Sequence, residues 1–136
     1  MINAALVDTP ARSRGGLTEL VMTDFGDQQG LILSMAAQLS QQNDGRWLTW
    51  ITDDRGLYQR LRQYPGLVQK GVRLVHCTEA SEQLWIIWDA LSLGNSHTVI
   101  ASPGALQDRA LAELEQAALK GASQGILVRY RHGLPS

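Results

Sequence analysis

The sequence predicts an α/β domain with three layers, in which helices cover both faces of a mostly parallel sheet. Short apolar runs typical of buried strands alternate along the chain with segments of helical periodicity. Residues 46–52 (RWLTWIT) are apolar on both parities. Trp47 and Ile51 face one way, and Leu48 and Trp50 face the other. A strand that is apolar on both faces belongs inside a sheet covered on both sides.

Length and composition favour one globular domain. The chain has 136 residues, of which 44% are hydrophobic and 18% charged, and its net charge is -1. That charge gives no general attraction to nucleic acid or to an anionic membrane surface. No run approaches the roughly 20 apolar residues of a membrane span, and Cys77 has no second cysteine for an internal disulfide. We therefore expect a cytoplasmic protein that binds neither nucleic acid nor membrane.

The amino-terminal part of the chain predicts an arm, a strand and a helix. Residues 1–16 have no sustained period and are expected to form a flexible arm. Residues 17–23 (LTELVMT) form the first expected strand. Residues 28–42 have apolar side chains at spacings of three and four, which predicts an amphipathic helix. Its expected inner face consists of Leu31, Ile32, Met35, Ala36 and Leu39.

After the central strand at 46–52, helices and strands continue to alternate. Residues 54–63 predict a short helix with one narrow apolar stripe. The remaining expected elements are a strand at 72–76, a helix from the N-cap Thr78 to Leu91, a strand at 97–101, a helix at 104–120 capped by Ser102 and Pro103, and a strand at 125–130. Residues 17–130 thus form a single expected domain, followed by a frayed tail at 131–136.

The usual ligand position of such a fold offers no nucleotide motif. Ligands of doubly wound sheets bind beyond the carboxyl ends of the strands, and the first connection is the usual phosphate cradle. Here that connection, residues 23–30 (TDFGDQQG), lacks both GxxxxGK[ST] and GxGxxG and carries two aspartates. Asp53 and Asp54 follow a strand where a metal or ribose ligand is possible, but helix capping is the favoured interpretation. We expect no cofactor.

The potential catalytic residues do not form a recognisable constellation. His76, His97 and His132 are far apart, and no zinc-ligand spacing accompanies His76 and Cys77. Ser102 lacks the GxSxG motif of a nucleophile elbow. We therefore expect no catalytic residue and no metal site. The alternative to a protein without catalytic activity is a divergent RecA-type ATPase that binds nucleotide or DNA.

Two groups of residues suggest protein binding. Arginine and lysine alternate with aromatic and aliphatic residues between positions 46 and 70, a composition enriched at interfaces. The competing interpretation, which composition alone favours, is that the apolar residues face the core and the basic ones face solvent. In the helix that ends near Leu91, Trp85 and Trp88 lie beside the main apolar stripe, so its apolar arc is wide enough for an interface.

Four stretches carry motifs that occur together in one family. Residues 46–52 are similar to an RWxLWLT-like segment, and residues 16–21 (GLTELV) resemble an opening strand. Residues 91–100 (LSLGNSHTVI) resemble a leucine, glycine-asparagine and hydrophobic-strand passage, and residues 121–126 (GASQGI) match a turn of small residues. Taken in their order along the chain, over residues 16–130, these stretches resemble the SulA family, the SOS-induced inhibitors of bacterial cell division.

The resemblance implies a RecA-like core without a working P-loop and without enzymatic activity. It implies an SOS-response inhibitor of septation that binds FtsZ, the tubulin-like division GTPase, at its T7-loop face. Binding there blocks protofilament assembly and so lowers GTPase activity. The family is also associated with homodimers, for which Trp85 and Trp88 are the candidate contact, and with degradation by the Lon protease, although the tail at 131–136 does not match the expected degradation signal.

Family residues linked to inhibition carry over to individual positions. They correspond to Arg46 and Ile51 in the central strand, to Leu61 where the family has tryptophan, and to a lysine near Lys70. We expect Arg46 to pair with a carboxylate of FtsZ and the leucines of this region to supply apolar contact. The expected FtsZ-binding residues are Arg46, Trp47, Ile51, Leu57, Leu61, Arg62, Leu67 and Lys70.

Overall fold

The strands and helices of the protein alternate from one end of the described chain to the other. The computed structural model describes residues 16–23, 28–41, 44–64 and 71–131. In chain order its elements are β1 (Gly16–Thr23), α2 (Gln28–Leu39), β2 (Trp47–Thr52), α3 (Leu57–Gln63), β3 (Val72–His76), α4 (Ala80–Ser92), β4 (Ser96–Ala101), α5 (Asp108–Gly121) and β5 (Gln124–Arg131).

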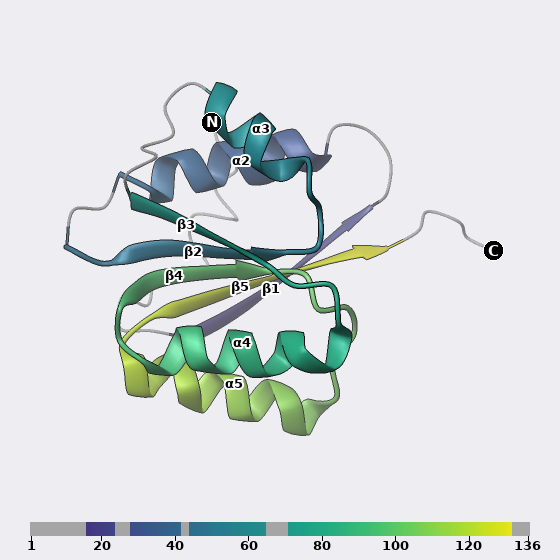
Figure 1. Ribbon diagram of the computed structural model, residues 1–136. Helices are drawn as coiled ribbons and strands as arrows, with labels where there is room; N and C mark the ends of the chain where they lie inside the picture. The colour runs from purple at the N-terminus through teal and green to yellow at the C-terminus, as the bar shows by residue number, and fades with distance from the viewer. Residues whose placement is uncertain (1–15, 24–27, 42–43, 65–70, 132–136) are drawn as a thin grey trace.

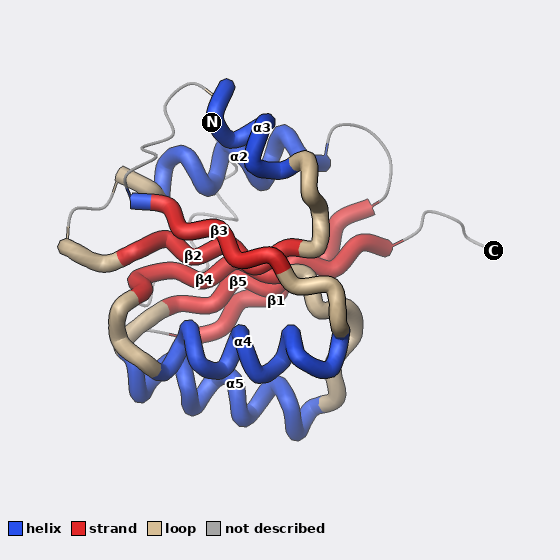
Figure 2. The backbone as a smooth tube through the Cα atoms, viewed as in Figure 1, coloured by secondary structure: helices blue, strands red, loops and turns tan. Residues whose placement is uncertain are grey.

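The five strands form one sheet in the order β1-β5-β4-β2-β3, and every neighbouring pair is parallel. Helices α2 and α3 cover one face, and α4 and α5 cover the other (Figure 1). Figure 2 shows the resulting layers, with the strands in red between two layers of blue helices. The chain crosses the sheet in one direction with α2 and α3 and returns with α4 and α5. Where the chain reverses its direction across the sheet, its helices also move to the other face. The crossovers therefore keep the same hand, as parallel sheets require. The predicted fold class is confirmed.

The strand predicted to be central lies inside the sheet but beside its middle. β4 is the middle strand, and all six of its residues are buried. β2 lies between β4 and the edge strand β3. The predicted parity of β2 is confirmed, because Leu48 and Trp50 pack under α2 and α3 whereas Ile51 packs against α4 and α5.

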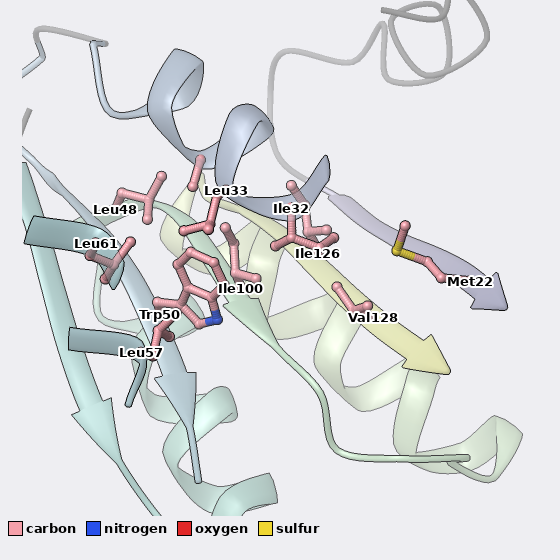
Figure 3. Packing of buried hydrophobic residues seen from close by; sticks show 11 residues of the cluster. Met22, Ile32, Leu33, Leu48, Trp50, Leu57, Leu61, Ile100, Ile126 and Val128 are labelled. Carbon is pink, nitrogen blue, oxygen red and sulfur yellow. The ribbon is translucent and has the colours of Figure 1, made fainter. Parts of the chain in front are cut away.

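Each face of the sheet has its own hydrophobic core. Under α2 and α3, Trp50 lies among Leu57, Leu61 and Ile100, with Ile32 and Leu33 reaching down from α2 (Figure 3). On the other face, Ile87 and Leu91 of α4 and Leu114 of α5 pack against Ile51 and Val99. β2 has apolar side chains on both of its faces, so it requires a core on each side of the sheet.

Three helices begin later than predicted. α4 starts at Ala80 with Glu79 at its N-cap position in place of Thr78, and neither side chain caps it as predicted. In α3 and α5, non-helical residues replace the expected first residues. α3 starts at Leu57 and not at residue 54, since the Asp54 carboxylate accepts the Gly56 N–H at 2.8 Å and holds a turn there. α5 starts at Asp108 and not at residue 104. Gly104 has a φ of +87°, outside the range of a right-handed helix, so Ser102 and Pro103 do not cap the helix as predicted.

The buried face of α2 is rotated relative to the prediction. Leu31 is 45% exposed, whereas Leu33 and Ala37, which were not expected inside, are buried. Ile32 and Ala36 are buried as predicted. The helix is apolar on most sides, so periodicity alone does not fix which side faces the sheet.

The carboxyl ends of α4 and α5 are in direct backbone contact. A Cβ atom at Gly121 would lie 1.9 Å from the Leu91 carbonyl oxygen, so only glycine fits there. Ser123 donates a hydrogen bond from Oγ to the same carbonyl at 2.8 Å. Ala122 ends α5 in a left-handed conformation with a φ of 51°. This junction lies beside the amino ends of β4 and β5.

Candidate partner-binding surface

The carboxyl edge of the sheet contains the topological switch point between β2 and β4. These neighbouring strands lead into helices on opposite faces, which is where doubly wound folds bind ligands. Asp54 pairs there with Arg60 and accepts the Gly56 N–H. Hydrogen bonds from Arg60 and then from Gly56 hold the pKa of Asp54 below its usual value. Asp54 therefore stabilises the turn into α3, which agrees with the favoured capping role.

Three other residues considered for metal binding or catalysis, Asp53, Cys77 and Ser102, follow β2, β3 and β4 at the same edge, whereas His97 lies near the amino end of β4. Asp53 and Ser102 are exposed. Cys77 is buried and directs its Sγ to the Glu79 carbonyl. Within the described ranges, no group of three or more His, Cys, Asp or Glu residues is placed to hold a metal ion. His132 lies outside those ranges.

At the amino edge, Arg46 connects three parts of the fold. Its guanidinium donates hydrogen bonds to the Asp44 carboxylate at 3.1 Å and to the Ala122 carbonyl at 2.9 Å. Longer bonds reach the carbonyls of Gly121 at 3.3 Å and Ser96 at 3.4 Å. Carbonyls at a helix carboxyl end carry partial negative charge, which favours a cation. Arg46 therefore holds the start of β2 against the end of α5.

His97 follows Ser96, whose carbonyl accepts a hydrogen bond from Arg46, near the start of β4. The β2–β4 register shifts between Trp47 and Leu48, and His97 falls within the shift. It is buried, and its Nδ1 lies 2.9 Å from Thr98 Oγ1. Burial lowers the pKa of His97, Asp44 opposes the change, and Arg46 reinforces it. Burial raises the pKa of Asp44, but the hydrogen bonds from Arg46 outweigh it, so that this pKa is below its usual value.

A second arginine at this edge, Arg73, was not expected to be functional. It lies on β3 opposite Thr49 of β2. Its guanidinium lies over the Trp47 ring, 5.7 Å from the centroid, and its Nη2 donates to Thr49 Oγ1 at 3.2 Å and to Ser96 Oγ at 3.4 Å. The available sequence signal was a single arginine in the otherwise apolar run at 72–75.

The predicted FtsZ-binding residues do not form one surface. Trp47 is 38% exposed at the amino edge. Arg62 is exposed on α3 and lies over the Tyr58 ring, 5.6 Å from its centroid. Ile51, Leu57 and Leu61 are between 1% and 4% exposed and belong to the two cores. Core packing already covers these three side chains, so a direct contact with a partner would require them to leave the core, and this contact stays a prediction. Leu67 and Lys70 lie outside the described residues.

A groove between α4 and α5 contains the two tryptophans considered for self-association. Trp85 is 66% exposed, and its ring meets that of Trp88 edge to face with centroids 6.1 Å apart. Lys120 of α5 lies over the Trp88 ring, 5.7 Å from the centroid. The groove encloses about 460 Å³ and is lined by Ser81, Leu84, Trp85, Trp88, Ala110, Glu113 and Leu114.

The fold and these surfaces define a class of protein, an α/β domain that presents arginine and tryptophan side chains suited to binding another protein. Residues 15–125 match the profile of the family described as "Cell division inhibitor SulA". The chain is 30% identical over 128 residues to "Cell division inhibitor SulA" of Pseudomonas aeruginosa, a match covering 93% of this chain and 77% of that protein. The chain belongs to the SulA family of cell division inhibitors.

A solved structure supports the same assignment. The fold is similar to the crystal structure of SulA from Pseudomonas aeruginosa, with a TM-score of 0.77 and 30% sequence identity. The match covers 85% of this chain and 98% of that chain. The resemblance inferred from the sequence is thus confirmed, and with it the assignment to a class of non-enzymatic inhibitors. No helix in the described part of the chain is long and apolar enough to cross a membrane.

Proposed function

We propose that this protein stops division during the SOS response to DNA damage by binding FtsZ at its T7-loop face. The observation that carries the proposal is the family match over residues 15–125. FtsZ hydrolyses GTP where one subunit completes the active site of the next. A protein bound at that contact ends protofilament growth and lowers GTPase activity without chemistry of its own, so binding free energy supplies the whole effect.

The amino edge is the surface best suited to this contact. Trp47 is partly exposed, and tryptophan and arginine are the side chains that most often dominate interfaces. Arg46, which we expected to meet a carboxylate of FtsZ, already pairs with Asp44 and with carbonyl groups. Its role in binding is therefore to fix the loop that presents Trp47. Arg62 on α3 extends the proposed surface towards the other face of the sheet.

Co-sedimentation of FtsZ polymers with GTP tests the proposal. Rising amounts of the protein should reduce pelleted FtsZ and GTP turnover together, with near-complete loss at an equimolar dose. The Trp47→Ala variant should need a higher dose. The Arg109→Ala variant, which removes an exposed side chain of α5, should match the wild type. Filaments that persist at equimolar dose would contradict the proposal. Nucleotide turnover by the purified protein alone would favour the ATPase alternative.

We also propose that two copies associate through the α4–α5 groove. The large exposed area of Trp85 and the edge-to-face contact with Trp88 support this surface, because exposed aromatic side chains beside a groove are typical of interfaces. Sedimentation velocity should show a dimer that Trp85→Ala dissociates. Tyr58→Ala, which removes another exposed aromatic residue from a different helix, is the matched control and should leave the dimer intact. A monomer at all concentrations would exclude this interface.

Turnover by the Lon protease remains a prediction from the family alone. The tail at 132–136 lies outside the described residues. Incubation with purified Lon and ATP should shorten the lifetime of the full chain, and deletion of residues 132–136 should restore it if the signal lies in that tail.

A further inference from the structure

Arg73 is a partly buried cation on the edge strand β3. Its neighbours Val72 and Leu74 pack against the core under α2 and α3. Because side chains alternate along a strand, Arg73 lies on the opposite face, beside Thr49 and Trp47 of β2. A guanidinium in this position has given up part of its hydration, and it requires compensating contacts.

Those contacts orient the guanidinium but do not neutralise it. Nη2 donates to the hydroxyl groups of Thr49 and Ser96, which are fully buried and lie 2.7 Å from each other. The Trp47 ring supports the group from one side. Arg73 Nε is buried and has no hydrogen-bond partner. Hydroxyl groups accept hydrogen bonds from Arg73 but carry no negative charge, so its positive charge is not balanced by them.

Arg46 at the amino edge and Arg60 at the carboxyl edge are different. Arg46 forms an ion pair with Asp44, and Arg60 forms one with Asp54. Within the described residues, no carboxylate lies within ion-pair distance of Arg73. Arg73 therefore combines three properties that suit a carboxylate from outside the chain. It is fixed in position, it is supported by a partly exposed indole, and it has no negative partner among the residues that the structure describes.

We propose that Arg73 and Trp47 form an anchor for an acidic side chain of the partner, with the indole covering the aliphatic part of that side chain. The inference rests on the proposed binding of FtsZ and names the residue type on FtsZ that this surface takes, an aspartate or a glutamate. Thr49 and Ser96 are positioning residues, because their bonds to Nη2 fix the plane of the guanidinium and leave Nη1 to donate to the carboxylate.

Equilibrium binding of FtsZ to the full chain, measured at several salt concentrations, tests the anchor. Arg73→Gln should weaken binding by about 30-fold, as expected for a central arginine contact. Arg73→Lys keeps the charge but loses the planar fork, and it should weaken binding by about tenfold. Arg109→Gln, an arginine change on exposed α5, should bind as the wild type does.

Salt dependence separates a direct contact from a structural effect. If Arg73 meets a carboxylate, wild-type affinity should fall with added salt more steeply than that of Arg73→Gln, because screening weakens an ion pair that the variant lacks. Equal salt dependence of the two proteins would overturn the inference. Thermal unfolding of each variant confirms that it is folded. If Arg73→Gln does not fold, the affinity of the Trp47→Leu variant for FtsZ tests the anchor instead. An approximately tenfold loss supports the anchor, and unchanged affinity overturns it.

The same experiment distinguishes this inference from the function on which it rests. Wild-type binding with unchanged affinity in a folded Arg73→Gln variant would overturn the anchor and leave the proposed function standing. Absence of wild-type binding would overturn both. If Arg73→Gln dissociates a dimer of this protein without changing FtsZ binding, the anchor serves a second copy of the chain and the inference is wrong.

Discussion

The two edges of the sheet use charged side chains in opposite ways. At the carboxyl edge, Asp54 and Arg60 neutralise each other and stabilise the turn before α3. At the amino edge, Arg46 is matched by Asp44, but Arg73 is held by hydroxyl groups and an indole. Folds of this class usually bind ligands at the carboxyl edge. The difference indicates that the side chains carried by a scaffold, and not the scaffold itself, decide where a candidate binding surface lies.

The most severe way to disrupt the amino edge is to add a side chain at Gly121. Gly121→Leu would place its Cβ against the Leu91 carbonyl oxygen, where the available separation is 1.9 Å. The ends of α4 and α5 would have to separate, and the carbonyls that hold Arg46 would move with them. We expect a loss of about 4 kcal/mol in the free energy of unfolding.

Chemical denaturation measures this loss. Ala112→Leu places the same side chain at an exposed position of α5 and should change the free energy of unfolding by less than about 0.5 kcal/mol. Similar stability of the two variants would show that the helix ends tolerate separation.

A pair of arginine variants compares the edges directly. Arg46→Ala removes an ion pair and hydrogen bonds to three carbonyls, and we expect a loss of about 2 kcal/mol in unfolding free energy. Arg60→Ala removes one ion pair whose side chains are 41% and 42% exposed. Solvent screens that pair, so its loss should be below about 1 kcal/mol.

Urea unfolding of the two variants under identical conditions provides the measurement. An equal cost at both positions would mean that the carbonyl contacts of Arg46 contribute little, and that the amino edge is no more firmly organised than the carboxyl edge.

Acidification should weaken the amino edge by a smaller amount. Burial lowers the pKa of His97 in the folded protein relative to its ordinary value of 6.5, so the unfolded chain binds more protons below that pH. The contribution of His97 to stability is therefore fully present above about pH 6.5 and is lost progressively as the pH falls. Asp44 moderates this loss, and Arg46 increases it.

Unfolding free energies at pH 7.5 and 5.5 test this expectation. The decrease on acidification should be smaller in His97→Gln than in the wild type. His76→Gln, a change at the exposed end of β3, is the control and should retain the wild-type decrease. An identical decrease in all three proteins would exclude His97 as its source.

The sequence predicts those features of the fold that depend on local periodicity. The two-sided burial of β2 follows from alternation, because Leu48 and Ile51 must point to opposite faces. The side of α2 that faces the sheet was misplaced, since Leu31 and Leu33 are equally apolar and only tertiary packing distinguishes them. The start of α5 was misplaced because Gly104 adopts a positive φ that a helix cannot contain.

The candidate site was harder to predict because its contacts join distant parts of the chain. Arg46 was identified as important, but its acceptors on Gly121 and Ala122 are far away in sequence and cannot be inferred from the motif. Leu57 and Leu61 were assigned to a partner, yet they form the only apolar stripe of a short helix. Such a stripe is needed by the core, and the core is where the structure places it.

The pairing of β1 has a consequence for the synthesis of this protein on the ribosome. Among the strands that the structure describes, β1 is the first along the chain and pairs only with the last, β5, with Gly16 opposite Gln124. A nascent chain therefore carries an unmatched first strand until β5 has been translated. Premature termination within α5 would leave that strand free to pair with other chains, so partial products should aggregate and should not act as weak inhibitors.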